Sequence, residues 1–395
     1  MASNDDPIEV TDELSAAEEN QVINEPRPRT NKQHALPLRH RHHPCLDVAE
    51  SDMPVAAGHG EDEDYTVHRM ILGTHTSGQA DDHLMIAEVH LPKDGIEGRD
   101  IGELYDEERQ ARIRVKQTIN HKGEVNRARY MPQNPDLIAT KTVDGPVFIF
   151  DRTKHETKAP VGGACKPDIT LVGQSKEGAS EDTTVAHWDI QQYKKDGNGI
   201  PPLRKYTGHS AYVGDVDWHP EHDYMFAWDT RSENSAKPAS QVEGHTAEVN
   251  AVAFAPSSPY LLLTGSSDKT VALWDIRKIS LKLHSFEGHT DDVLQVAWSP
   301  HSPVHFASAA GDRRVNIWNL DAIGAEQTPD DAEDGPPELM FVHGGHTAKV
   351  NDISWSPMAK WHIATTAEDN ILQVWEPSRH IRAAAEADVN AMDLE

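Results

Sequence analysis

The sequence predicts an all-β propeller built from repeated four-stranded units. The main observation is a spacing that occurs four times: a His, an Asp 23 residues later, and a Trp or Phe six residues after that. Chance does not keep three residue types in register four times, so the chain consists of repeated supersecondary units of about 40 to 45 residues. The four sets are His121, Asp144 and Phe150; His245, Asp268 and Trp274; His289, Asp312 and Trp318; and His346, Asp369 and Trp375.

The second observation is that each unit contains short apolar runs separated by turns. In the unit that begins at Gly244, the pattern predicts strands at 249–255, 261–265 and 271–275, and a fourth at 281–286. Four short antiparallel strands repeated around an axis form the blades of a propeller.

Composition excludes several classes of protein. No apolar run approaches the roughly 20 residues of a membrane helix, and the acidic N-terminus predicts no secretory signal. Only Cys45 and Cys165 occur, which excludes a disulfide framework and suits a reducing compartment. A net charge of -28 argues against direct contact with nucleic acid and favours a basic partner. The alternative is that the acidic residues only keep a large surface soluble.

Ser, His and Asp in one unit suggest a nucleophilic triad, but catalysis needs one site, and here His and Asp recur in four units. The chain has no Gly-x-Ser-x-Gly motif, phosphate loop or metal-type Cys pairing. The pair His219 and His222 lacks carboxylate or Cys partners at convincing spacing. The sequence therefore predicts no enzyme, no cofactor and no metal site.

The repeats resemble the WD-repeat family, with Gly-His at one end and Trp-Asp at the other, as at 188–189, 228–229 and 274–275. The resemblance implies a hydrogen-bonded structural set of the His, a Ser or Thr two residues before the Asp, the Asp and the Trp. The set is complete as His245, Ser266, Asp268 and Trp274. Ala310 and Ala367 replace the hydroxyl in the two later units, which are expected to lose one link.

Four stretches resemble one branch of that family, the histone-binding WD-repeat proteins related to the retinoblastoma-binding proteins and the small subunit of chromatin assembly factor one. They lie at 68–76 (HRMILGTHT), 121–135 (HKGEVNRARYMPQNP), 268–285 (DKTVALWDIRKISLKLHS) and 331–350 (DAEDGPPELMFVHGGHTAKV). The resemblance implies a seven-bladed, non-catalytic propeller in the nucleus, and also in the cytoplasm. Its implied partners are core histones of types three and four and other subunits of assembly, acetyltransferase, deacetylase, remodelling or methyltransferase complexes.

One implied histone site is an acidic loop at the side of the propeller. The step from His289 to His346 is 57 residues, against 44 from His245 to His289, so 13 residues are inserted. A solvated or disordered charge run is the alternative, but a Pro pair and apolar neighbours favour a shaped lip for a basic amphipathic helix. The predicted residues are Asp330, Asp331, Glu333, Asp334, Leu339 and Phe341.

The other implied site is the top face, around the central channel, which takes a basic histone tail. Acceptors there would bind Lys and Arg by charge-assisted hydrogen bonds, although Gly214 and Lys349 interrupt the ring. Acids that only solvate the loop tips are the alternative. The predicted residues are Glu124, Asn126, Glu177, Glu248, Asn250, Asp292 and Asn351.

A different function also fits the sequence, that of a substrate-receptor adaptor of a cullin ubiquitin ligase. The segments 228–231 and 274–277 resemble the Trp-Asp-x-Arg box by which some WD-repeat proteins dock on ligase adaptors, which points to Arg231 and Arg277. The alternative is that an Arg simply follows the repeat signature.

The sequence predicts four regions: an acidic helix in 1–25, an irregular Pro/His/Arg-rich segment at 26–61, the propeller at 62–376, and a helix or tail at 377–395. Two units are short: 14 residues separate Gln174 from Trp188 and 19 separate His209 from Trp228, where 29 is the rule. The sequence thus predicts two incomplete blades and short terminal helices. A faulty reading frame or splice form and a genuine disordered linker are both open for 26–60.

Overall fold

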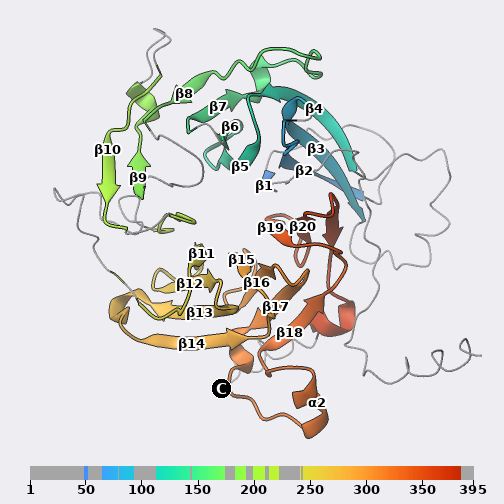
Figure 1. The fold of residues 1–395 in the computed structure, drawn as a ribbon. Helices are drawn as coiled ribbons and strands as arrows, with labels where there is room; N and C mark the ends of the chain where they lie inside the picture. The colour runs from blue at the N-terminus through green and yellow to red at the C-terminus, as the bar shows by residue number, and fades with distance from the viewer. Residues whose placement is uncertain are drawn as a thin grey trace, which may run out of the picture.

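A computed structural model describes residues 49–51, 65–78, 80–92, 113–142, 145–173, 183–192, 199–209, 213–221, 241 and 243–383. Its strands form antiparallel sheets that stand around a central axis like the blades of a propeller (Figure 1). The predicted all-β fold class is confirmed. Within the described residues, no helix has the length and apolarity needed to cross a membrane.

Blades 1 and 2 are four-stranded sheets in sequence order. Blade 1 contains β1 (Ala49–Ser51), β2 (Tyr65–Gly73), β3 (Asp82–Pro92) and β4 (Ile113–His121). Blade 2 contains β5 (Val125–Met131), β6 (Asn134–Thr142), β7 (Val147–Asp151) and β8 (Ile169–Leu171), with the 3-10 turn η1 (Arg152–Lys154) after β7.

Blades 5, 6 and 7 carry the predicted His–Asp–Trp repeats. Blade 5 has β11 (Val249–Phe254), β12 (Leu261–Ser266), β13 (Thr270–Asp275), η3 (Ile276–Lys278) and β14 (Lys282–Glu287). Blade 6 has β15 (Val293–Trp298), β16 (His305–Ala310), β17 (Val315–Asn319), η4 (Leu320–Ala322), α2 (Pro329–Glu333) and β18 (Leu339–His343). Blade 7 has β19 (Val350–Trp355), β20 (Ile363–Ala367) and β21 (Leu372–Trp375), followed by a helical turn at 379–383.

The two short units form much less sheet in their described residues. Blade 3 pairs β9 (Thr184–His187) with β10 (Arg204–Thr207), with η2 (Ile190–Gln192) between them. At the fourth position the described segment 213–221 contains no strand, and it lies between Tyr206 of blade 3 and β11 of blade 5. The helix predicted for 1–25 lies outside the described residues.

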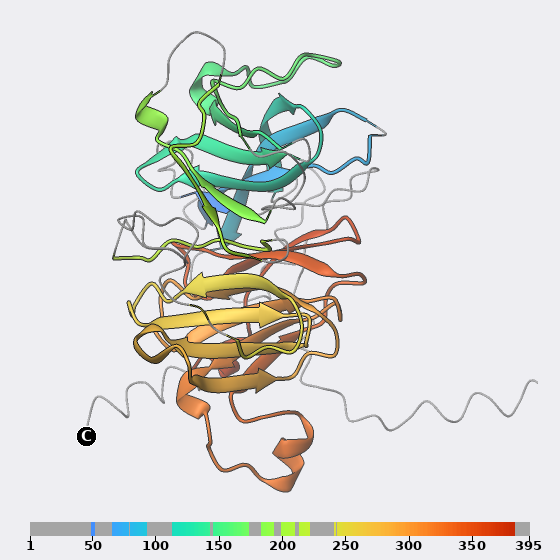
Figure 2. The same ribbon diagram turned by 60° about the vertical axis from the view of Figure 1, so that its left-hand side comes forward.

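Packing between blades buries the core. Alternate apolar side chains of each inner and middle strand pack against the next blade, as where Val293 and Trp298 of blade 6 meet Leu263 of blade 5. The ring closes where blade 7 packs on blade 1. There Leu372 of blade 7 belongs to the same buried cluster as Met70 and Met85 of blade 1. Figure 2 shows the blades stacked side by side around the ring, with α2 projecting beyond the rim of blade 6.

Four buried side chains form a hydrogen-bonded chain across blade 6. The indole of Trp318 donates to Ser308 Oγ at 2.8 Å, and that hydroxyl donates to His289 Nε2 at 2.7 Å. The other ring nitrogen, Nδ1, donates to Asp312 Oδ2 at 2.9 Å. This network assigns the histidine proton to Nδ1. The equivalent chains are His245, Thr264, Asp268 and Trp274 in blade 5 and His346, Thr365, Asp369 and Trp375 in blade 7.

The prediction that Ser266 completes this set is wrong. Its hydroxyl accepts a hydrogen bond from the backbone N–H of Asp268 at 3.1 Å, which shapes the turn. The hydroxyl that joins His245 to Trp274 belongs to Thr264, four residues before the Asp.

The expected loss of a link at Ala310 and Ala367 is wrong for the same reason. Blades 6 and 7 carry the linking hydroxyl at Ser308 and Thr365, and both residues are fully buried. The hydrogen-bonded chain is therefore complete in all three blades.

Replacing Ser308 with Ala is expected to destabilise the protein by about 2 kcal/mol, because two buried nitrogen atoms, Nε2 of His289 and Nε1 of Trp318, lose their partner. Thermal unfolding monitored by circular dichroism measures this cost. The matched control is Ala310→Ser, which adds a hydroxyl at the position the repeat pattern suggested. A stabilisation by Ala310→Ser as large as the cost of Ser308→Ala would contradict this assignment.

Candidate functional site

The inner strands of blades 2, 5, 6 and 7 begin at equivalent positions, namely at Val125, Val249, Val293 and Val350. These strands, β5, β11, β15 and β19, surround the central channel (Figure 1). Because the blades repeat around the axis, the strands run in the same direction along the channel and begin at one end of it. That end is the top face. The residues just before the four strands are Glu124, Glu248, Asp292 and Lys349.

The acidic residues of the top face differ in their surroundings. Glu248 is exposed, Asp292 is half-buried, and Oε1 of Glu124 lies 3.1 Å from Nε2 of His75. The Asn250 amide donates to Val293 O of the next blade at 2.9 Å, so this side chain also ties two blades together. Asn126 and Asn351 are half-buried, and Glu177 lies outside the described residues.

The insertion in blade 6 forms a folded loop between β17 and β18 that contains the short helix α2. Thr328 caps the helix: its hydroxyl accepts from the Asp331 N–H at 3.1 Å and donates to Asp331 Oδ2 at 2.7 Å. Gln327 Nε2 closes the base of the loop by donating to Gly335 O at 3.1 Å. Asp330, Asp331, Glu333 and Asp334 are all exposed on this loop.

A pair of side chains, one buried and one half-buried, fixes the stem of the loop. Glu338 is only 5% exposed, and its Oε1 lies 2.7 Å from Nε2 of His284 on β14. The Glu338 carbonyl also accepts from Asn319 N at 2.9 Å. Sequence reasoning missed this anchor, because His284 and Glu338 are 54 positions apart and belong to different blades. The acidic tip is therefore carried on a rigid base.

The two apolar residues predicted for the lip are not exposed. Phe341 is 8% exposed on β18, where its ring lies 5.8 Å from that of Trp375 in the core of blade 7. Leu339 is half-buried and packs against the cluster of Trp318 and Phe306. The prediction that Leu339 and Phe341 form an exposed binding lip is wrong, because inter-blade packing uses both side chains. The described surface of the loop is acidic.

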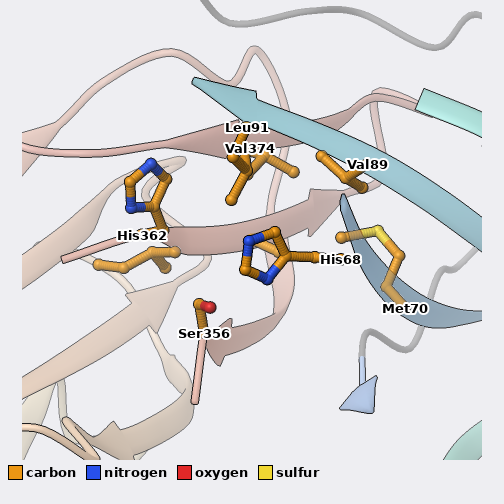
Figure 3. A pocket seen from close by; sticks show the side chains of 9 residues that line it. His68, Met70, Val89, Leu91, Ser356, His362 and Val374 are labelled. Atoms are coloured by element: carbon orange, nitrogen blue, oxygen red, sulfur yellow. The ribbon is translucent and has the colours of Figure 1, made fainter. Parts of the chain in front are cut away.

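A small cavity lies where blades 7 and 1 meet. Figure 3 shows the rings of His68 and His362 beside Ser356, with Met70 and Leu91 completing part of the wall. Its volume of about 10 Å³ is close to that needed for one water molecule. This site belongs to ring closure and is too small for a ligand.

In blade 6, the side chains of Ser308, His289 and Asp312 are at most 3% exposed. Ser308 is fully buried, and its hydroxyl is held between an indole and an imidazole. A nucleophile needs access to its substrate, which this hydroxyl lacks. Among the residues that the structure describes, no group of three or more His, Cys, Asp or Glu side chains comes together as a metal site.

Comparison with protein families gives two matches. Residues 200–227, 236–275, 280–319 and 337–376 match the WD domain, G-beta repeat, family. Residues 40–93 match the family of the histone-binding protein RBBP4, which also covers a subunit of the CAF1 complex, and this match begins inside the irregular segment predicted at 26–61. The four matched repeats and the matched histone-binding region agree with the propeller fold and with the acidic loop of blade 6. The chain belongs to the histone-binding WD-repeat family.

Proposed function

We propose that this protein is a non-catalytic scaffold subunit of chromatin assembly and modification complexes that binds core histones of types three and four at two surfaces. The observation that carries the proposal is the rigid acidic loop of blade 6 in a chain that matches a histone-binding family. Histones are basic, and a protein with a net charge of -28 attracts basic partners over several ångströms of solvent. Such subunits work in the nucleus, and the cytoplasm is a second location in the proposal.

The acidic loop is the proposed site for a basic amphipathic helix. The α2 tip presents Asp330, Asp331, Glu333 and Asp334 to solvent, while the pair of His284 and Glu338 holds its base. A fixed array of carboxylates loses little entropy when a Lys or Arg binds, which favours affinity. Pairs at such an exposed surface are individually weak and are screened by salt.

The top face is the proposed site for a basic histone tail. Glu248 and Asp292 stand at the start of adjacent inner strands, and the Asn250 side chain fixes the spacing between those strands. Carboxylates at a channel mouth focus their field on a narrow region, which suits a single extended chain.

Titration with two labelled histone peptides tests the proposal. One peptide is the basic tail, the other is the first helix of its partner histone, and each is titrated at two salt concentrations. Binding of at least one peptide, weaker at high salt, is expected. Binding of neither peptide by folded protein would contradict the proposed function.

Replacing two carboxylates of the loop with neutral amides, as Asp331→Asn and Asp334→Asn together, is expected to weaken helix binding about tenfold. Loss of two exposed charge pairs costs about 1 to 2 kcal/mol in total. Fluorescence anisotropy with the helix peptide measures the change, and the tail peptide serves as the control ligand. An unchanged affinity for the helix would place its site elsewhere.

Arg277 supports a second candidate function, docking on a ligase adaptor. Its side chain is 61% exposed, and Asp275 Oδ2 accepts from Arg277 Nη2 at 2.7 Å. The guanidinium also stacks over the Tyr260 ring at 4.2 Å, so it is presented in one orientation. Arg231 lies outside the described residues. Arg277→Ala is expected to abolish adaptor binding in a pull-down if this function holds, and to leave histone binding unchanged.

A further inference from the structure

The lower end of the channel, opposite the top face, contains a cavity of about 460 Å³. It is lined by the second halves of the inner strands and the residues that follow them, because its wall includes Phe254 of β11, Trp298 of β15 and Trp355 of β19. This volume is in the range of ligand-binding pockets. Neither the histone-binding proposal nor the repeat pattern assigns a role to it.

The aromatic side of the cavity is fixed by hydrogen bonds between blades. Trp298 Nε1 donates to Ala253 O of blade 5 at 3.1 Å, and Trp355 Nε1 donates to Ala297 O of blade 6 at 3.0 Å. The two indoles therefore hold their orientation without a ligand. Aromatic faces attract ammonium and guanidinium groups, most strongly where water is excluded.

The charged side of the cavity comes from β5 and the segment 213–221. Arg127 Nη1 donates to Asp215 Oδ1 at 2.6 Å, so these two charges compensate each other. Arg129 Nη1 lies 3.5 Å from the buried carboxylate of Asp352 on β19. Each guanidinium of the wall thus already has a carboxylate beside it.

Asp217 is the remaining carboxylate of the wall. It accepts from Phe254 N at 2.8 Å and from Trp218 N at 2.9 Å, and no basic side chain of the described residues lies within ion-pair distance of it. Burial, with a contribution from the neighbouring Asp215, raises the pKa of Asp217 to about 6, although Arg129 and the backbone N–H groups act in the opposite direction. Above that pH Asp217 is a negative charge in the cavity wall with no basic side chain of the described residues at ion-pair distance.

We propose that this cavity, here called the lower channel site, binds a Lys or Arg side chain from a partner protein segment that approaches the face opposite the top face. The cation pairs with Asp217, beside the small parts of Trp298 and Trp355 that line the cavity; these residues are 7% and 6% exposed. An anion would meet Arg127 and Arg129 only by displacing their existing carboxylate partners. The wall therefore selects a cation.

The test uses the full chain and two small probes, N-acetyl-arginine amide and its uncharged analogue N-acetyl-citrulline amide, in saturation-transfer NMR and calorimetric titration at pH 7.5. The arginine probe is expected to bind at least tenfold more tightly than the citrulline probe. Asp217→Asn, which keeps an acceptor for Phe254 N, is expected to weaken arginine binding at least tenfold. The matched control Asp136→Asn makes the same change at an ion pair with Arg152 in blade 2, outside the cavity wall, and is expected to leave binding unchanged.

Two further measurements separate this site from the top face and from misfolding. Ser354→Leu fills the cavity from β19 without removing a charge, and it is expected to abolish probe binding while the chain keeps its melting temperature within a few degrees. Arginine binding is also expected to weaken as the pH falls through about 6, because Asp217 then takes up a proton. The other charged groups around Asp217 are Asp215, Arg127, Arg129 and Asp352. Equal binding of the two probes, loss of binding in Asp136→Asn, or displacement of the probe by the histone tail would overturn the proposal.

Discussion

Reversing the charges of Glu248 and Asp292, as Glu248→Lys and Asp292→Lys together, is expected to weaken histone-tail binding at least 100-fold. The two carboxylates lie at the start of neighbouring inner strands on the top face. Each well-formed charge-assisted hydrogen bond contributes about 1.5 to 3 kcal/mol, so losing two costs about 3 to 6 kcal/mol. Because 1.4 kcal/mol is a factor of ten, the loss amounts to about 100-fold or more. Titration with the labelled tail at fixed salt measures it.

The control for this prediction is Asp330→Lys with Glu333→Lys on the acidic loop, which changes the net charge by the same amount. These variants are expected to leave tail affinity within about threefold of the parent, because screening over a Debye length of about 8 Å isolates the loop from the top face. If the two double variants weakened tail binding equally, the affinity for the tail would depend on the net charge of the protein. That result would contradict the proposed top-face site.

Replacing Asp312 with Ala is expected to destabilise the protein by about 3 kcal/mol, because it removes a buried hydrogen-bonded partner. One carboxylate oxygen accepts from both His289 Nδ1 and Thr290 N, each at 2.9 Å, and the other accepts from Arg314 N at 3.1 Å. The side chain is 3% exposed, so water does not replace these bonds. Urea denaturation measures the free energy of unfolding. Asp275→Ala, on an exposed ion pair with Arg277, is the control and is expected to cost less than about 1 kcal/mol.

This contribution of Asp312 depends on pH in a defined direction. Burial alone would raise the pKa of Asp312, but the hydrogen bond from His289 and those from the N–H groups of Thr290 and Arg314 outweigh burial and lower it. The folded pKa therefore lies below the unfolded value of about 3.9. The stabilisation is complete above that value and is lost as the pH falls through the folded pKa. The stability gap between parent and Asp312→Asn is expected to narrow only below about pH 4, and a gap that stayed constant from pH 8 to pH 3 would contradict this account.

The repeat register could be predicted because each His, Asp and Trp acts within one unit. Asp268 caps its own turn through Thr270 N, at 3.1 Å, and binds the His 23 positions earlier in the same blade. Lys269 has a φ of 73° in that turn, and the carboxylate supports this left-handed backbone. Interactions of this kind fix sequence spacing directly, so spacing predicted the propeller.

The linking hydroxyl could not be predicted from spacing. Thr264 and Ser266 share one face of β12, because side chains alternate along a strand. Only the pairing of Leu262 with Trp274 places Thr264 diagonally beside the indole, within reach of its N–H.

What the sequence by itself determined is the fold class, the family and the acidic composition of the blade 6 loop, because these depend on residues close together in one repeat. Only the tertiary structure decided which of those residues remain available for binding. Phe341 packs against Trp375 of the next blade, and Glu338 is anchored by His284 of the previous one. The lower channel site joins β5, the segment 213–221, β11, β15 and β19. Contacts between blades join positions that no repeat period relates, so they are set by how the blades pack around the ring.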